Sequence, residues 1–247
     1  MKKALSLLYG VVCYLAFFGT ILYAIGFVGN LFVPKTIDSE PQVALSTAIL
    51  INASLLLLFA LQHSIMARPA FKRWWTTIVP VHLERSTYVL LASLCLMLLF
   101  WQWQPIGGVV WSVQNAVAKN ILLVLYIVGW ALVFGSTFLI NHFDLFGLRQ
   151  VWLYATGNSY SQLPFRTPMF YRVVRHPLYL GFLIAFWSAP VMTIAHLLFG
   201  VLTTGYILTA IQLEERDLVE SFGEKYSSYR KWVPMILPFT KRKIARR

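Results

Sequence analysis

Two groups of ionisable residues enclose an uncharged stretch of about 37 residues in the second half of the chain. Arg175 and His176 precede the stretch, and Glu214 and Glu215 follow it. Ionisable side chains beside a long apolar run are costly unless they face a bundle interior or a wet cavity. If the stretch folds back on itself, the four groups meet at one membrane interface. We therefore treat them as candidates for one functional pocket rather than as separate anchors of helix ends.

The uncharged stretch is too long to be one membrane helix. From Pro177 to Leu213 a single helix would be roughly 55 Å long, whereas the hydrocarbon core of a bilayer is roughly 30 Å thick. Ser188-Ala189-Pro190 provides a break, because proline removes a backbone donor and disfavours helix in the residue before it. We therefore predict an antiparallel helical hairpin that returns the two glutamates to the level of Arg175.

The segment that contains this hairpin carries a specific combination of motifs. An Arg-His-Pro-x-Tyr-x-Gly segment comes first, the Glu-Glu pair follows the hairpin, and a Phe-Gly-x-x-Tyr-x-x-Tyr tail ends at Tyr229. Over about residues 172 to 234 this combination resembles the membrane methyltransferases of the isoprenylcysteine carboxyl methyltransferase and phospholipid methyltransferase group. The resemblance implies a site for S-adenosylmethionine, with S-adenosylhomocysteine as product, in which a cation binds the ligand carboxylate and carboxylates bind its amine or hydroxyls. The residues assigned to that site are Arg175, His176, Pro177, Tyr179, Gly181, Glu214, Glu215 and Tyr229.

Further polar residues lie at the ends of other predicted spans, on the side where this pocket would open. They are Gln62, His63 and Arg68 after the second span, Glu84, Arg85, Ser86 and Tyr88 before the third, and Asn141, His142, Asp144, Arg149 and Gln150 after the fourth. A shared pocket would explain their common position. For single residues other interpretations stay open: His63 as a hydrogen-bonded bundle histidine, Arg68 and Arg85 as lipid anchors, and His142 as a helix cap.

Two of these segments are similar to the methanethiol S-methyltransferases. They run from Gln62 to Val89 and from Asn141 to Val151, and together with the hairpin the similarity covers about residues 45 to 235. It implies methyl transfer from S-adenosylmethionine to a small thiol, which converts methanethiol to dimethyl sulfide. The alternatives are a phospholipid or isoprenylcysteine-type methyltransferase, a non-catalytic NnrU-like membrane protein, and a sterol-reductase-like protein with a nicotinamide cofactor. The intact cofactor motifs argue against the second of these, and the short chain argues against the third.

Methyl transfer to a thiol requires alignment of the reactants and removal of one proton. The sulfonium is already a good leaving group, so the protein mainly aligns the nucleophile and excludes water. A thiol has a pKa of about 8.5 or higher and reacts as the thiolate, so a base or a positive field must raise the thiolate fraction. His142 with Asp144 could provide an oriented imidazole, and Arg85 and Arg149 could provide the field. Tyr88 completes this catalytic set, and the identity of the base stays open.

The composition is that of a polytopic membrane protein. Of the 247 residues, 58% are hydrophobic and 12% are charged, so no soluble domain has room to fold. We predict an all-α transmembrane bundle with four spans in residues 1–141, within the uncharged runs 4–33, 43–67, 86–103 and 120–141. In residues 142–247 a cytoplasmic loop, the hairpin and a basic tail then form the methyl-donor site, and both parts belong to one structural domain. The first run is too long for a signal peptide and is predicted to be a retained span.

The charge distribution predicts the orientation. Of the 21 lysines and arginines, 19 lie at the termini and in loops that alternate with loops carrying only Lys35 and Lys119. By the positive-inside rule both termini are cytoplasmic, in a bacterial inner membrane. The net charge of +12 then reflects topology and attraction to anionic membrane lipid, so no nucleic acid and no obligate protein partner is predicted. Cys13 and Cys95 lie singly in spans, without the spacing of a metal site or a disulfide framework.

Overall fold

The structure, a computed structural model, describes residues 1–238 and 240 and is mostly helical. Among these residues, five helices are long and apolar enough to cross a membrane: α1 (Lys2–Gly29), α2 (Leu45–Ala67), α4 (Val81–Gln102), α5 (Ala116–Ile140) and α9 (Ile194–Phe222). The shorter elements are α3 (Pro69–Trp75), β1 (Val109–Ser112), α6 (His142–Leu145), α7 (Leu148–Thr156), η1 (Met169–Arg172), α8 (Pro177–Trp187), β2 (Val191–Thr193) and α10 (Glu224–Trp232). The chain is therefore a helical membrane protein.

The first four long helices lie where the sequence predicted spans. α4 ends at Gln102, close to its predicted end, and α5 begins after Asn115, whose side-chain oxygen accepts a hydrogen bond from the Ala118 N–H (3.0 Å). The break of the hairpin falls after Trp187, as predicted. Its arms are unequal, because α8 has 11 residues and α9 has 29, so the two glutamates lie inside α9. The count of four spans plus a hairpin stays a prediction, and the basic residues at 241–247 lie outside the described part of the chain.

The chain divides into two compact units. Unit 1 comprises Met1–Val113, Phe143–Ser161 and Pro190–Thr203, and unit 2 comprises Gln114–His142, Gln162–Ala189 and the chain from Thr204 onward. α9 contributes residues 194–203 to unit 1 and its remainder to unit 2. The division at residue 141 into a bundle and a donor-site region stays a prediction.

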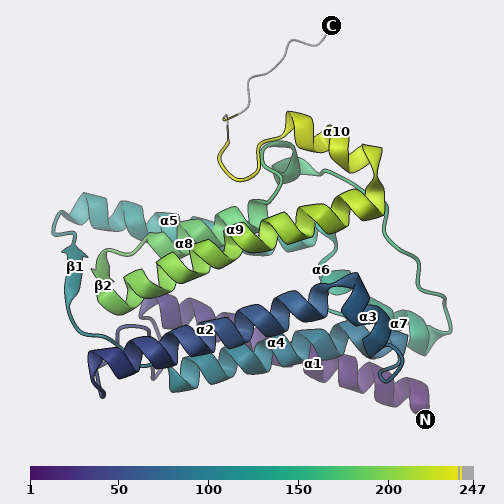
Figure 1. Cartoon of the computed structure of the whole chain (residues 1–247), viewed down its shortest axis with the longest axis horizontal. Coiled ribbons are helices and arrows are strands. Elements are labelled where there is room, and N and C mark those ends of the chain that lie inside the picture. The colour runs from purple at the N-terminus through teal and green to yellow at the C-terminus, as the bar shows by residue number, and fades with distance from the viewer. Residues whose placement is uncertain (239, 241–247) are drawn as a thin grey trace, which may run out of the picture. The chain divides into compact units, whose positions relative to one another are not determined.

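In unit 1, α4 packs against both α1 and α2, and α1 also packs against α7 (Figure 1). Aromatic rings fill the contact between α1 and α4, where the centroids of Phe27 and Phe100 are 4.8 Å apart. α1 and α7 approach closely at Gly10, where an added Cβ would lie 2.4 Å from Val151. These contacts fix the position of α4, whose first turns carry Arg85 and Tyr88 of the predicted catalytic set.

A two-stranded antiparallel ribbon joins β1 to β2 in unit 1, with Val109 opposite Thr193. The prediction of an all-α chain did not include it. Strands of four and three residues leave no alternation long enough to be recognised in a sequence.

A polar cluster connects the loop after α1 to β2 and the start of α9. Asp38 accepts hydrogen bonds from Thr193 and from Asn30 (2.7 Å), and the imidazole of His196 lies 3.7 Å from the same carboxylate. Burial alone would raise the pKa of Asp38, but the interactions with His196, Thr193 and Asn30 outweigh burial and lower it. The ionised carboxylate therefore holds the 30–44 loop to the start of α9.

In unit 2, α5 and α8 cross with their backbones in close contact. An added Cβ at Gly129 would lie 2.8 Å from the carbonyl oxygen of Gly181, and an added Cβ at Gly181 would lie 2.7 Å from that of Gly129. Only a hydrogen at each position permits this approach. The crossing fixes α8, which follows His176 and carries Tyr179 in its first turn.

The part of α9 in unit 2 runs antiparallel to α8. The indole N–H of Trp187 at the end of α8 donates to Thr204 (3.0 Å), and Tyr179 near its start contacts Glu214. Between these contacts Ile207 and the following turn of α9 form a buried apolar cluster with α8. The hairpin thus brings its first and last turns together.

Candidate functional site

Arg175, just before α8, and Glu215, within α9, form a buried ion pair in unit 2. Arg175 Nε donates to Glu215 Oε1 over 2.6 Å, and the two side chains are 7% and 6% exposed. His176 Nε2 lies 3.0 Å from the same oxygen. A buried carboxylate is stable only when charges and hydrogen bonds offset its lost hydration. Here one oxygen contacts both a guanidinium and an imidazole.

The neighbouring Glu214 is more accessible. Its side chain is 43% exposed, and its Oε2 lies 4.0 Å from His176 Nδ1. The Tyr179 hydroxyl donates to the same oxygen over 3.0 Å. A carboxylate that is oriented by neighbours but open to solvent can accept hydrogen bonds from the hydroxyl or amine of a ligand.

The end of α10 and the segment after it complete the surroundings of Arg175. Its Nη1 donates to the carbonyl oxygens of Val233 (2.6 Å) and Arg230 (3.2 Å), and its backbone N–H donates to that of Pro234 (2.8 Å). The half-exposed Arg230 side chain lies 3.7 Å from Glu215 Oε2. Arg175 therefore holds this segment against α9, and Arg230 places a second cation at the exposed edge of the site.

Aromatic rings cover the α10 side of the site. The Tyr229 hydroxyl donates to the Tyr171 carbonyl, and Tyr226 and Tyr229 pack on Phe165 with centroid distances of 5.8 and 5.5 Å. Burial raises the pKa of Tyr171, Tyr226 and Tyr229, and neighbouring carboxylates add to the effect. The three phenols therefore stay neutral, and the Tyr226 hydroxyl is buried with no hydrogen-bond partner among the described residues.

Pro177 and Gly181, which the sequence assigned to cofactor binding, make packing contacts. Pro177 is buried at the first position of α8, where its missing N–H would have no partner in the helix. Gly181 forms the close crossing with α5 described above. Both residues fix the direction of α8, and a direct contact with a ligand stays a prediction.

The predicted catalytic residues that lie in unit 1 form two groups. Near the start of α4, the Arg85 guanidinium carbon lies 5.8 Å from the ring centroid of Tyr88, whose hydroxyl contacts His63. At α6 and α7, Asp144 accepts a 2.8 Å hydrogen bond from Arg149 Nη1. The carboxylate that the sequence offered as a partner for His142 thus pairs with an arginine.

His142 makes its described contacts within unit 2. Its Nδ1 lies 2.8 Å from the Thr137 hydroxyl oxygen, and its ring stacks on Phe138 with a centroid distance of 4.2 Å. Burial lowers the pKa of His142 below its ordinary value. A neutral imidazole held by a hydroxyl can accept a proton, so its candidacy as a base stays a prediction.

The structure gathers the ionisable members of the predicted donor site in unit 2, together with Tyr179 and Tyr229. The predicted catalytic residues are divided, with His142 in unit 2 and the other four in unit 1. Sequence reasoning missed Tyr226, Arg230 and Tyr171. Tyr226 is the first tyrosine of the tail motif and could have been included, whereas the roles of Arg230 and Tyr171 depend on the chain reversal around α10 and leave no sequence signal.

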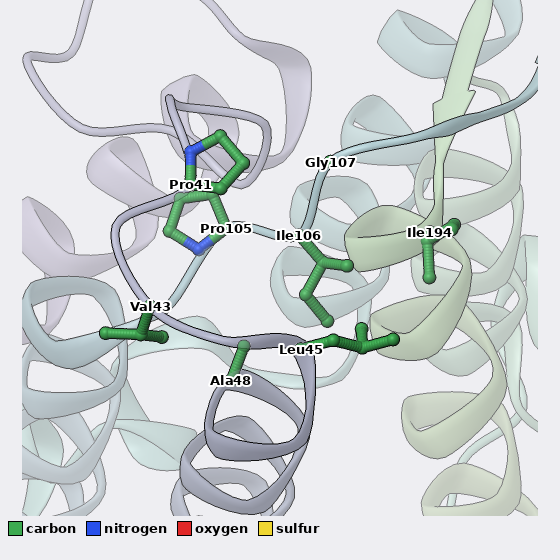
Figure 2. Close-up of a pocket in the computed structure, with 8 residues that line it drawn as sticks. All are labelled: Pro41, Val43, Leu45, Ala48, Pro105, Ile106, Gly107 and Ile194. Atoms are coloured by element: carbon green, nitrogen blue, oxygen red, sulfur yellow. The ribbon is translucent and has the colours of Figure 1, made fainter.

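A cavity of about 180 Å³ lies in unit 1, at the end of α2 opposite to His63 (Figure 2). It is lined by Pro41, Val43, Leu45, Ala48, Pro105, Ile106, Gly107 and Ile194. None of these eight residues is ionisable. The cavity therefore offers no group that could hold a charged ligand or take a proton from a thiol, and we place neither task there.

The chain is similar to a described protein family and to several named proteins. Residues 50–226 match the family described as NnrU protein, and this range includes Arg175 and both glutamates. The methanethiol S-methyltransferase of Crocosphaera subtropica is 56% identical over 243 residues, which cover 98% of this chain and 95% of that protein. The protein of the same name from Mycobacterium tuberculosis is 50% identical over 242 residues, or 98% of this chain and 99% of that protein.

A more distant relative comes from an animal. Nurim of Mus musculus is 33% identical over 173 residues, which cover 66% of this chain and 65% of that protein. No solved structure matches the chain.

Proposed function

Since the chain belongs to the NnrU protein family, we propose that it is a membrane-embedded methyltransferase that transfers a methyl group from S-adenosylmethionine to methanethiol. The observation that carries the proposal is identity of 50 to 56% over nearly the whole chain to relatives named methanethiol S-methyltransferase. Family membership alone does not separate an enzyme from a non-catalytic protein, because the family's description names no activity. The extent of the identity to named enzymes favours the enzyme.

The residues around Glu215 suit this methyl donor. S-adenosylmethionine carries a carboxylate, an amine and ribose hydroxyls, and the exposed edge of the site offers the carboxylate of Glu214 and the cation of Arg230. We propose that Glu214, Tyr179 and His176 contact the donor, while the buried pair of Arg175 and Glu215 holds them in place. Pro177, Gly181 and Tyr229 shape the surrounding walls. When bound, the donor supplies a methyl group activated by a sulfonium.

The remaining chemistry is ionisation of the thiol. His142, Asp144, Arg149, Arg85 and Tyr88 are the residues proposed for this task. Neutral His142 is suited to take up a proton, and a guanidinium such as Arg85 favours the thiolate over the thiol. Asp144 forms an ion pair with Arg149 and so fixes the position of the Arg149 guanidinium. Alignment and exclusion of water account for the rest of the rate.

The orientation follows from the charges. We propose that the side of the membrane with 19 of the 21 basic residues is the cytoplasm. S-adenosylmethionine is made in the cytosol, so a donor site among these residues is on the side where the donor is available. A bacterial inner membrane is the proposed location.

Calorimetry and turnover with purified protein in detergent test the function. We expect S-adenosylhomocysteine to bind and methanethiol to be methylated to dimethyl sulfide in preference to phospholipid and prenylcysteine acceptors. Preference for either lipid acceptor would replace the small-thiol assignment with a lipid methyltransferase. Absence of both binding and turnover would reject the enzyme.

A series of thiols of increasing chain length separates a closed acceptor site from a lipid-facing groove. Each added methylene could gain about 0.8 kcal/mol of transfer free energy in an open apolar groove, whereas a closed site excludes longer chains by clashes. We expect kcat/KM to fall from methanethiol through ethanethiol to propanethiol. A steady rise along the series would contradict the closed site.

A further inference from the structure

His63, in α2, contacts the start of α4 within unit 1. The Tyr88 hydroxyl oxygen lies 3.0 Å from each ring nitrogen of His63, and the two ring centroids are 5.2 Å apart. Tyr88 is 7% exposed, whereas His63 is only half-buried. A buried phenol thus holds an imidazole whose residue is not fully buried.

Two guanidinium groups act on this pair. Arg85, one turn before Tyr88 on α4, has its Cζ 5.8 Å from the ring centroid of Tyr88. Arg68, at the end of α2, is held by a hydrogen bond from its Nε to the Ser64 carbonyl (3.1 Å). Both cations act electrostatically on the imidazole of His63. They favour an anion that is bound beside it.

The rest of the neighbourhood is apolar. Met66 and Val89 are buried with Tyr88, and Phe146 packs against them. The amide oxygen of Gln62, one turn before Met66, is buried and has no hydrogen-bond partner among the described residues. Such surroundings admit a small neutral molecule more readily than a hydrated ion. They suit an uncharged thiol whose proton is removed after it has entered.

We propose that His63 and Tyr88 form the binding site of the acceptor sulfur, with His63 receiving the thiol proton. This inference rests on the proposed function and names His63 as the base in place of His142. The Tyr88 hydroxyl then donates a hydrogen bond to the thiolate, and Arg68 and Arg85 stabilise its charge. The negative charge formed on sulfur offsets the positive charge formed on His63.

Atoms and charges balance in this step. The S–H bond breaks, its proton moves to a ring nitrogen of His63, and the electron pair stays on sulfur. The thiolate attacks the methyl carbon, so a new C–S bond forms while the bond from that carbon to the sulfonium breaks and its electron pair returns to the leaving sulfur. His63 then releases the proton to water. The net products are a methyl thioether, neutral S-adenosylhomocysteine and one proton.

Acceptors of different acidity test the role of His63. Methaneselenol is far more acidic than methanethiol and is ionised in neutral water, so it requires no base. We expect His63→Gln to lower kcat/KM for methanethiol by on the order of 100-fold and to leave kcat/KM for methaneselenol nearly unchanged. Tyr88→Phe should lower kcat/KM for methanethiol by a smaller factor, because it removes one hydrogen bond to the thiolate and keeps the base.

His82→Gln is the matched control. His82 lies in the first turn of α4 and stacks on Tyr154 at a centroid distance of 3.6 Å. We expect this variant to methylate both acceptors as the wild type does. Unchanged affinity for S-adenosylhomocysteine in all variants shows that each has folded.

A measurement without turnover completes the test. Methanethiol added to the wild-type complex with S-adenosylhomocysteine should give the ultraviolet absorbance of a thiolate at neutral pH, and His63→Gln should lose it. Equal losses for methanethiol and methaneselenol, or an unchanged thiolate signal, would overturn the role of His63 alone. Absence of wild-type turnover with both acceptors would overturn the proposed function, and this inference with it.

Discussion

At the level of single residues, the two adjacent glutamates of α9 have different surroundings. Glu215 is buried against Arg175 and His176, whereas Glu214 is open to solvent and contacts Tyr179. Removing one partner of a buried ion pair leaves the other charge without compensation, whereas removing an exposed carboxylate leaves the fold intact. The pair therefore combines one residue that stabilises the site with one that is available to a ligand.

Alanine substitutions of the two glutamates should give opposite results. Glu214→Ala should weaken S-adenosylhomocysteine binding by roughly ten- to hundred-fold, because it removes a charge-assisted hydrogen bond, and should unfold as the wild type does. Glu215→Ala should lower stability by about 3 to 5 kcal/mol. Calorimetry and thermal unfolding in detergent measure the two effects, and Glu220→Ala, an exposed position on the same helix, is the control. Wild-type affinity in Glu214→Ala would remove that residue from the proposed site.

His142 makes stability depend on pH in a defined direction. Its pKa is lowered in the folded protein, so below its ordinary value of 6.5 the unfolded chain binds more protons than the folded chain. We expect the unfolding temperature to fall as the pH decreases from about 7 to about 5, and His142→Gln to reduce this dependence. A pH dependence that is the same in the variant and the wild type would mean that another group is responsible.

At the residue level, the sequence indicated which ionisable residues would lie together but not how each would be placed. Arg175, His176 and the two glutamates were recognised because charges next to a long apolar stretch are rare and costly. Which glutamate is buried could not be predicted, because adjacent helical residues differ by about 100° around the axis. The rotation of α9 against α8 decides that question, and it depends on packing rather than on the motif.

At the level of elements, the crossing of α5 and α8 determines where the first turn of α8 lies. Gly129 and Gly181 allow the two backbones to touch. Small residues at such crossings are a general device for close packing of helices in membranes. The motif glycine therefore has a structural explanation that is independent of any ligand.

Gly129→Ala should separate the two helices. The added methyl group would lie 2.7 Å from the Ala185 backbone nitrogen, so α8 must shift. We expect a loss of about 1 to 3 kcal/mol in stability, together with weaker S-adenosylhomocysteine binding. The same substitution at Gly205, where an added Cβ meets nothing within 4 Å, is the control. If both variants behave as the wild type, the crossing is looser than described.

Helix ends were predictable where the bilayer constrains them. The C-terminal ends of α2, α4 and α5 follow from charge-free runs of a length that matches the membrane, whereas α4 and α5 begin before the charged residues that bound their runs. The unequal arms of the hairpin and the β1–β2 ribbon were not predictable. Both depend on contacts between segments that are distant in the sequence, and neither changes the local hydropathy.

At the level of the whole molecule, the prediction that matters most is the side of the membrane on which each loop lies. Exposed Glu40 belongs to a loop with few basic residues, and Trp232 belongs to the strongly basic C-terminal region. With Cys13 and Cys95 replaced by serine, we expect an impermeant maleimide to label Glu40→Cys from the outside of cells and Trp232→Cys only after permeabilisation. Labelling of both from the same side would show that the number of spans between them is wrong, and the common position of the polar residues would lose its basis.

The Asp38 cluster has a consequence for synthesis of the chain. Asp38 and its partner Thr193 are 155 residues apart in sequence. At about 5 to 20 residues per second, the ribosome needs roughly 8 to 30 s to make the intervening chain. During that interval the Asp38 carboxylate must remain hydrated while the helices between Asp38 and Thr193 enter the membrane. A nascent chain that ends before β2 would therefore lack the contact between Asp38 and Thr193 that holds the 30–44 loop. The protease sensitivity of this loop should then show how far translation and insertion have proceeded.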